Sequence, residues 1–208
     1  MVMKYLIFDF NGTIVNDLDL SLECINYCRK KYLGLGPLSI EEYRDIFTFP
    51  VKDYYLRAGF DFNVQNWDEV ANCWMDHYLK HHHECKIFDG VTDLVNEAHS
   101  KGYKCIVISA SKEDTLKQQL IELGVYDIFD DIIGLTDIFA ISKIESAINY
   151  FKGQDINDSI LIGDTDHDKE TADKIGCKCI LIASGHQSFD KLKKVNDIVY
   201  NSIKEVKL

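Results

Sequence analysis

Apolar and polar residues follow two different rhythms along most of this chain. Short apolar runs have the length of strands buried on both faces of a sheet, and they lie at 4–8, 103–109, 159–162 and 177–182. Between them, apolar residues recur at helical spacing over 91–101, 112–123, 141–151 and 169–174. Because strands that alternate with helices pair in parallel, the pattern predicts an α/β fold with a doubly wound parallel sheet.

Residues 17–83 interrupt this rhythm with helix-like segments alone. Ser39 and Glu42 form a potential capping box, and further helices are predicted at 51–58 and 64–82. The pattern therefore predicts a helical insertion after the first strand. We expect residues 1–15 and 85–208 to form an α/β core domain and residues 16–84 to form an inserted all-α domain.

Composition narrows the classes of partner. The net charge is −11, which argues against nucleic-acid binding because that binding depends on clustered Lys and Arg. No apolar run reaches the roughly 18 residues of a membrane span, and no leader-like segment opens the chain. Seven scattered cysteines are typical of free thiols in a reducing compartment. We therefore expect a cytoplasmic protein, a monomer or weak dimer, with no membrane or nucleic-acid partner.

Polar residues stand where three of the predicted strands end. Asp9, Ser109 and Asp164 follow apolar runs, and Lys143 begins a predicted helix between the second and third of these runs. The carboxyl ends of parallel strands share one edge of a sheet, so these side chains are expected to converge. Carboxylates that converge need a cation, and hard oxygen ligands in an incomplete cage suit Mg²⁺.

The same edge has groups that could hold a phosphoryl group. Gly12 permits close approach of the backbone, and the hydroxyls of Thr13 and Ser109 would complete a phosphate cradle with Lys143. Asp9 would then face an electrophilic phosphorus, which a carboxylate can attack to form an aspartyl-phosphate. Taken alone, residues 9–13 could equally be a buried strand that ends in an Asn-Gly turn.

The polar strand ends resemble the four motifs of the haloacid dehalogenase superfamily of hydrolases. In chain order they are Asp9-Phe10-Asn11-Gly12-Thr13, Ser109, Lys143 and Gly163-Asp164-Thr165-Asp166-His167-Asp168. The resemblance covers nearly the whole chain and is strongest to phosphoglycolate phosphatase-like members. It implies a Rossmann-like core in which residues 16–84 form a helical cap of the first type, which supplies specificity contacts and excludes water.

The resemblance also implies a role for each matching residue. Asp9 would be the catalytic nucleophile, and Lys143 would neutralise it. The metal ligands would be Asp9, the backbone carbonyl of Asn11, Asp164 and Asp168. The substrate-binding residues would be Gly12, Thr13, Ser109 and Ala110. The implied activity is that of a Mg²⁺-dependent phosphatase, a phosphoric monoester hydrolase that acts on a small phosphorylated metabolite through an aspartyl-phosphate.

Asn11 departs from the superfamily pattern. Phosphatases of the superfamily usually carry aspartate at this position, which protonates the leaving oxygen and then activates water. An amide has no usable acid or base form near neutral pH, and general acid–base catalysis contributes about 10²–10⁴ in rate. We therefore expect a slow enzyme, an enzyme for a good leaving group such as an acyl or aryl phosphate, or one that recruits another group such as His167 or a cap residue.

Two other functions remain open at this point. A protein with an intact site and no proton shuttle could bind a phosphorylated ligand without turning it over. A 2-haloacid dehalogenase also uses a carboxylate nucleophile but needs no metal, and the pairing of Asp164 with Asp168 argues against it.

Some residue assignments also have competitors. Lys112 could replace Lys143, because Ile144 stands where the superfamily pattern often has proline. Asp166 is expected at the surface or just outside the ligands, and three further residues near the same edge are expected to be ordinary loop residues: Ser111, His167 and His186. The cap cations are expected to be solvated surface residues: Arg44, Lys52 and Arg57. The sequence does not select one phosphorylated substrate.

Overall fold

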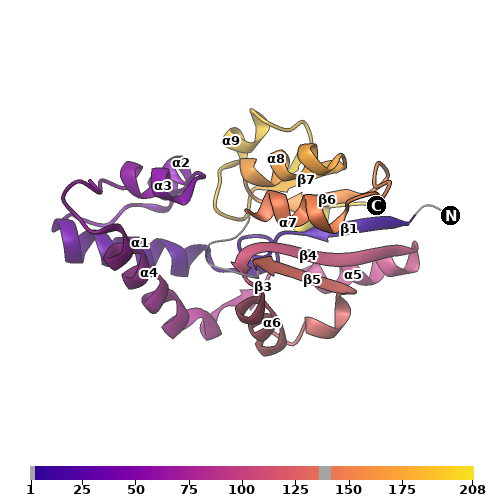
Figure 1. Cartoon of the computed structure of the whole chain (residues 1–208), viewed down its shortest axis with the longest axis horizontal. Helices are drawn as coiled ribbons and strands as arrows, with labels where there is room; N and C mark the ends of the chain where they lie inside the picture. Colours follow the sequence, from indigo (N-terminus) through magenta and orange to yellow (C-terminus); the bar gives the residue numbers. More distant parts are fainter. Residues whose placement is uncertain (1–2, 136–141) are drawn as a thin grey trace.

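The computed structural model describes residues 3–135 and 142–208. These residues contain a six-stranded parallel sheet with the strand order β5-β4-β1-β6-β7-β8 (Figure 1). Its strands are β1 (Lys4–Phe8), β4 (Tyr103–Lys112), β5 (Asp131–Leu135), β6 (Ile160–Gly163), β7 (Lys178–Ile182) and β8 (Val199–Tyr200). The predicted α/β fold with a doubly wound parallel sheet is confirmed.

Strand β1 lies at the centre of the sheet because it is apolar on both faces. Leu6 and Phe8 pack into one apolar cluster, whereas Tyr5 and Ile7 pack into a second, as the alternation of a strand requires. The first cluster includes side chains of α5 (Val91–Ser100) and α6 (Glu113–Glu122). The second includes side chains of α7 (Lys143–Tyr150), α8 (Asp166–Ile175) and α9 (Phe189–Lys193). Helices therefore cover both faces of the sheet.

Four helices between β2 and β3 pack around an apolar cluster of their own. They are α1 (Leu18–Leu33), α2 (Ile40–Ile46), α3 (Val51–Arg57) and α4 (Trp67–His81), and a short 3₁₀ turn, η1 (His82–Glu84), follows them. Their cluster contains Ile25, Tyr43, Tyr55 and Val70. The predicted capping box is present, because the Ser39 side chain accepts from the Glu42 amide at 3.2 Å. Figure 1 shows these helices beyond one end of the sheet.

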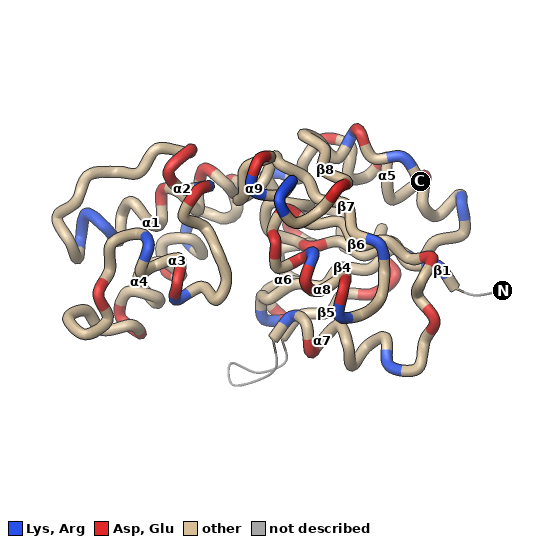
Figure 2. The backbone as a smooth tube through the Cα atoms, turned by 90° about the horizontal axis from the view of Figure 1, so that it is seen from above, with Lys and Arg blue, Asp and Glu red and all other residues tan. Residues whose placement is uncertain are grey.

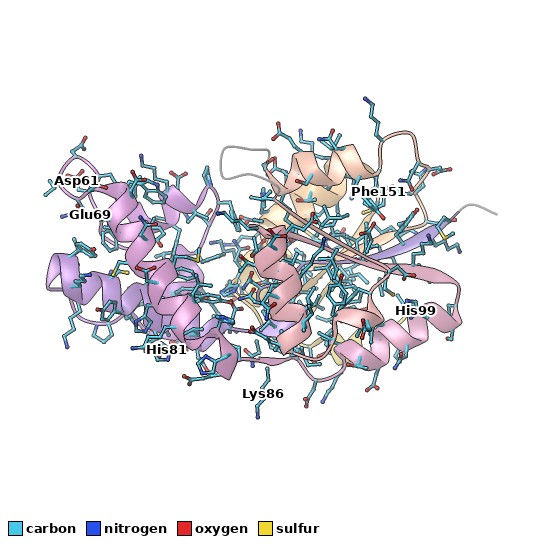
Figure 3. All side chains as sticks on the ribbon, turned by 60° about the horizontal axis from the view of Figure 1, so that its bottom comes forward. Asp61, Glu69, His81, Lys86, His99 and Phe151 are labelled. Atoms are coloured by element: carbon cyan, nitrogen blue, oxygen red, sulfur yellow. The ribbon has the colours of Figure 1, made fainter. Side chains whose placement is uncertain are left out.

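A two-stranded antiparallel ribbon joins the helical segment to the sheet. Strand β2 (Val15–Asn16) pairs with β3 (Lys86–Ile87) where the chain leaves the core and where it returns. In Figure 3, Lys86 lies between His81 at the end of α4 and the α/β part that carries His99. Strands of two residues are too short to show a period, so this ribbon could not be predicted from the sequence.

Three boundaries predicted from the sequence are wrong. The helix predicted from residue 64 is α4, which begins at Trp67 because the Asn66 side chain caps it. Helix α8 begins at Asp166 rather than at 169, because Thr165 and Asp168 form a capping box that starts the helix earlier. Strand β4 continues to Lys112, past an irregularity after Ile108, so Lys112 ends a strand and does not open α6. The predicted helix at 141–151 is present as α7 from Lys143, and position 141 lies outside the described residues.

Two further expectations concern the surface and the thiols. Within residues 3–135 and 142–208, no helix has both the length and the apolarity needed to cross a membrane. All seven cysteines are free thiols, as expected. Figure 2 shows acidic and basic residues interspersed over the helical and α/β parts alike.

Candidate active site

The carboxyl ends of two neighbouring strands carry the first two acidic residues of the site. Asp9 directly follows β1, and Asp164 directly follows β6. The two strands pair in parallel, with Phe8 opposite Ile162, and the Asp9 amide donates to the Ile162 carbonyl at 2.9 Å. Their acidic side chains therefore leave the sheet at the same edge.

Two helices bring the third acidic residue and a lysine to the same point. The Lys143 ammonium, at the start of α7, donates to Asp9 Oδ1 and to Asp168 Oδ1 in the first turn of α8. Asp9, Asp164 and Asp168 offer carboxylate oxygens that all lie within 4.8 Å of one another. Residues that are far apart in the sequence thus converge, as predicted from the strand ends.

Burial changes the protonation of this cluster. It raises the pKa of Asp9 to about 8, and the Lys143 ammonium offsets only part of that shift. It raises the pKa of Asp164 to about 7, against the opposing charge of His186. Burial alone would also raise the pKa of Asp168, but Lys143 and the hydrogen bonds from Thr165 hold that pKa below its usual value. One ammonium group does not compensate three buried carboxylates.

The donor set fits a divalent metal ion. Three carboxylates offer hard oxygen ligands on one side, and a cation there would offset the burial and the mutual repulsion that raise the pKa values of Asp9 and Asp164. Gly163 leaves room for this arrangement, since a Cβ at that position would overlap the Asp168 side chain. The residues present are therefore suited to Mg²⁺.

The loop after β1 packs tightly over Asp164. Gly12 has a φ of 70°, and a Cβ there would overlap the Asp164 carboxylate. The buried Thr13 hydroxyl donates to Asp164 Oδ1 at 3.3 Å. In this structure Thr13 therefore contacts a neighbouring carboxylate. A cavity of about 900 Å³ opens over the carboxylate cluster, and neither Gly12 nor Thr13 lines it.

The last part of β4, past the irregularity after Ile108, does face the cavity. Ser109 and Ala110, the other two residues predicted to bind substrate, both line it. The Ser109 hydroxyl also accepts from the Ser111 amide at 3.1 Å, within the irregular part of β4. Lys112 lines the cavity too, but Lys143 is the lysine that contacts Asp9.

The Asn11 side chain is held by two residues that the sequence did not indicate. Its amide nitrogen donates to Asp17 Oδ2 at 2.7 Å and to the Tyr78 hydroxyl at 2.8 Å. Tyr78 in turn donates to Asp17 Oδ2 at 2.9 Å, and the Gly12 amide donates to Asp17 Oδ1 at 2.9 Å. Asp17 accepts only, so the amide nitrogen of Asn11 must face it, and both amide hydrogens are engaged.

His186 links this network to the helical segment. Its backbone amide donates to Asp164 Oδ2 at 2.6 Å, and its Nε2 lies 3.3 Å from Asp17 Oδ1. The other ring nitrogen lies 2.9 Å from the Tyr43 hydroxyl on α2. Burial by itself would lower the pKa of His186, but the nearby carboxylates, Asp17 above all, raise it to about 9. His186 is therefore a buried cation that contacts both parts of the molecule.

Asp166 and His167 occupy the first turn of α8 and point to other partners. Asp166 Oδ1 accepts from the Gln187 side chain at 2.8 Å, outside the carboxylate cluster. The His167 ring stacks on Phe49 with centroids 4.6 Å apart, and it lines the cavity. The sequence could not indicate that stacking, because Phe49 lies in the helical segment.

The cavity of about 900 Å³ opens over the cluster, between the helical segment and the edge of the sheet. Asp9, Asp164 and Lys143 lie on its α/β side, and aromatic residues of α2 to α4 lie on the other. Figure 3 shows side chains of the two parts meeting in this region. Its volume exceeds what a phosphate group needs, so it can take a sizeable organic ligand.

The chain belongs to the haloacid dehalogenase-like hydrolase family, whose model matches residues 6–182. The predicted superfamily and the prediction of a hydrolase are confirmed. A predicted phosphatase from Clostridium acetobutylicum superimposes with a TM-score of 0.81, at 20% identity over 99% of this chain and 96% of that one. At this level of identity the superposition supports the fold alone.

Sequence relatives carry two kinds of name. Pyrophosphatase PpaX of Listeria monocytogenes is 25% identical over 170 residues, 79% of this chain and 76% of that protein. Phosphoglycolate phosphatase of Synechococcus elongatus is 21% identical over 187 residues, 88% of this chain and 85% of that protein. The chain spans only 60% of a further relative, from Clostridium perfringens, at 29% identity over 133 residues.

Proposed function

We propose that this protein is a Mg²⁺-dependent phosphatase that hydrolyses a small phosphorylated compound through an aspartyl-phosphate on Asp9. The observation that carries the proposal is the convergence of Lys143 and three carboxylates beneath one large cavity. The names of the relatives, pyrophosphatase and phosphoglycolate phosphatase, support phosphate chemistry at this site.

The residues would divide the work as follows. Asp9 attacks phosphorus once it is ionised, Lys143 orients its carboxylate, and a bound cation would complete its ionisation. Ser109 and Ala110, which line the cavity, would hold the phosphoryl oxygens, whereas Thr13 would support Asp164. Mg²⁺, held by Asp9, Asp164, Asp168 and the Asn11 carbonyl, would neutralise charge on the transferring group. 

The two structural parts would correspond to two domains. Residues 1–15 and 85–208 would be the catalytic core, and residues 16–84 a cap that closes over the cavity and excludes water. A cytoplasmic location and a monomeric or weakly dimeric state stay predictions.

Asn11 supports a restricted rather than a general phosphatase. Both hydrogens of its side-chain amide are donated to Asp17 and Tyr78. The only other polar atom of the side chain is its carbonyl oxygen, which can only accept a hydrogen bond. Asn11 therefore has no proton to give to a leaving group. The same observation supports the second candidate function, a protein that binds a phosphorylated ligand without turnover. A dehalogenase needs only the nucleophile, which leaves the rest of the carboxylate cluster without a purpose.

Release of inorganic phosphate tests the proposal. The purified protein would be incubated with phenyl phosphate, pyrophosphate and phosphoglycolate, with Mg²⁺ or with EDTA, beside the variant Asp9→Asn. We expect Mg²⁺-dependent release from at least one compound by the unmodified chain, and loss of that release in Asp9→Asn. Retention of fluoroberyllate by the protein without turnover of any compound would instead indicate the binding function.

A further inference from the structure

The wall of the cavity that faces the carboxylates is apolar and aromatic. On α4 it is formed by one helical stripe: Trp67, Ala71, Trp74, Met75, Tyr78 and Leu79. Met75 and Leu79 are 47% and 42% exposed, although each is large and apolar. Exposed apolar side chains that line a cavity mark a surface that an apolar ligand group would cover.

Cations are missing from that wall within the described residues. Lys112 and Lys143 are the lysines that line the cavity, both on the α/β side, and no arginine lines it. Arg44 of the helical segment is engaged elsewhere, since it donates to the carbonyls of Gly185 and Ser184 at 3.0 Å each. Residues 136–141, which lie outside the description, contain neither Lys nor Arg. Lys112, Lys143 and the cationic His186 all belong to the α/β side of the cavity, so a second anionic group placed against the helical wall would meet no opposite charge there.

Two buried donors on the same wall have no partner among the described residues. The Tyr54 hydroxyl and the Trp74 Nε1 are both buried and unbonded, and both side chains line the cavity. Tyr54 is only 3% exposed. Both donor atoms are themselves covered, so a ligand oxygen could accept from either one only after its side chain moves.

Leaving-group chemistry disfavours alkyl esters such as phosphoglycolate, while the apolar wall disfavours pyrophosphate, whose leaving phosphate needs no acid. Asn11 cannot protonate a departing oxygen, so an alcohol would have to leave as a strongly basic alkoxide. A phenol, whose pKa is about 10, leaves as phenolate without that help. The two features are independent: the absent acid excludes alkyl esters, and the aromatic wall selects an aryl group among the remaining substrates.

Building on the phosphatase function above, we propose that the substrate is an aryl phosphate, the monoester of a large and mainly apolar phenol. This class differs from pyrophosphate and phosphoglycolate, the compounds for which relatives are named, because each of those carries a second anionic group. The aryl group would occupy the aromatic wall while the phosphoryl group meets Asp9 and Lys143.

The reaction balances without an acid at position 11. Asp9 Oδ forms a bond to phosphorus while the phosphorus–aryl oxygen bond breaks, and its electron pair departs on the phenolate. In the second step the oxygen of a water molecule forms a bond to phosphorus while the bond between phosphorus and Asp9 breaks. One proton of that water stays on its oxygen and the other passes to a phosphoryl oxygen, so the products are phenolate, dihydrogen phosphate and free Asp9.

A matched pair of non-hydrolysable ligands tests the proposal by binding. Benzylphosphonate and phosphonoacetate have the same methylene phosphonate and differ in a phenyl ring against a carboxylate. Both tryptophans of the chain line the cavity, so tryptophan fluorescence with Mg²⁺ present reports occupancy. We expect benzylphosphonate to bind about tenfold more tightly or better, from burial of the ring. Equal or tighter binding of phosphonoacetate, or no binding of either, would overturn the proposal.

A variant that adds a positive charge to the aromatic wall tests the role of that wall in ligand selectivity. Met75→Lys places a cation in the cavity, and we expect it to narrow or reverse the preference for benzylphosphonate over phosphonoacetate. Asp76→Asn is the control: it changes the net charge equally, at an exposed residue that does not line the cavity. An equal change of preference in both variants would contradict a role for the wall.

Hydrolysis rates distinguish the proposal of an aryl phosphate substrate from the more general proposal of a phosphatase. Faster hydrolysis of phenyl phosphate than of pyrophosphate and phosphoglycolate, by about tenfold in kcat/KM, would support both. Preferred hydrolysis of pyrophosphate or phosphoglycolate would overturn the aryl proposal and leave the phosphatase function intact. Preferred binding of benzylphosphonate without any turnover would remove the phosphatase function but support the aryl selectivity of the cavity.

Discussion

At the scale of single residues, Asn11 decides what chemistry the site can perform. Its amide nitrogen faces Asp17, so the side chain is fixed in an orientation in which it cannot donate to a substrate. Aspartate at the same position would lie beside the Asp17 carboxylate, which would raise the pKa of the new carboxyl group. A carboxyl group with a raised pKa is a better general acid near neutral pH.

We therefore expect Asn11→Asp to accelerate esters with poor leaving groups most. Hydrolysis of benzyl phosphate, which releases an alcohol, should rise by about tenfold or more, and phenyl phosphate should gain less. Steady-state kinetics with both esters would measure the difference, with Asn11→Leu as the control that supplies no acid. A uniform gain for both esters, or none, would show that residue 11 does not serve the leaving group.

Lys143 is the second residue whose role depends on its surroundings. It is 4% exposed and contacts two carboxylates, whereas Lys112 is exposed. Removing one partner of a buried ion pair costs about 3–5 kcal/mol of unfolding free energy. We expect the unfolding free energy of Lys143→Met, measured by urea denaturation in EDTA, to be lower by about that amount. Mg²⁺ should restore part of the lost free energy. Lys112→Met should change stability by less than about 0.5 kcal/mol, and a larger effect would make Lys112 part of the buried cluster.

At the scale of elements, α2 and the segment after it are joined to the loop between β7 and α9. Arg44 donates to Gly185 and Ser184, and Lys191 donates to the Asp45 carbonyl at 3.0 Å. Phe47 also stacks on His186, with centroids 4.9 Å apart. These contacts attach the helical segment to the α/β part beside the site.

The variant Arg44→Ala should loosen that attachment. A hydrogen bond from a charged group contributes roughly 1.5 kcal/mol, so amide exchange in Ile40–Ile46 should become about tenfold faster. Hydrogen–deuterium exchange measured by mass spectrometry would detect this change. Arg57→Ala is the control, since Arg57 is an exposed arginine of α3. Unchanged exchange in α2 would mean that the other contacts suffice.

At the scale of the whole molecule, the stability of the folded state without metal should decrease as pH rises. Burial raises the pKa of Asp9 to about 8 and of Asp164 to about 7, so the folded chain binds protons that the unfolded chain has released above pH 4. His186, with a pKa raised to about 9, binds a proton in the folded state that the unfolded state releases near 6.5. All three groups make the folded state less stable as pH rises.

We therefore expect the Tm of the protein in EDTA to fall steadily from pH 6 to pH 9. Saturating Mg²⁺ should flatten this dependence, because a bound cation favours the ionised carboxylates in the folded state. Differential scanning calorimetry across the pH range would measure both slopes. In Asp9→Asn the slope in EDTA should be smaller, and an identical slope would exclude Asp9 from the effect.

Much of this organisation followed from the sequence because it is local or periodic. The apolar run before Asp9 is wholly buried as β1, and Ser39 with Glu42 caps α2 as its spacing predicts. The early start of α8 was missed because Thr165 and Asp168 looked like loop residues next to a predicted ligand. Their capping box is a local signal that the motif obscured.

The sequence by itself determined the parallel sheet, the insertion after its first strand and the residues that meet at its edge. These depend on periodicity and on the rule that parallel strands end together. Only the tertiary structure decided that Asp17 and Tyr78 hold Asn11, that His186 joins the two parts, and that α4 presents aromatic side chains to the site. Those contacts join residues far apart in the chain, and no spacing along a single sequence records which distant side chains will touch.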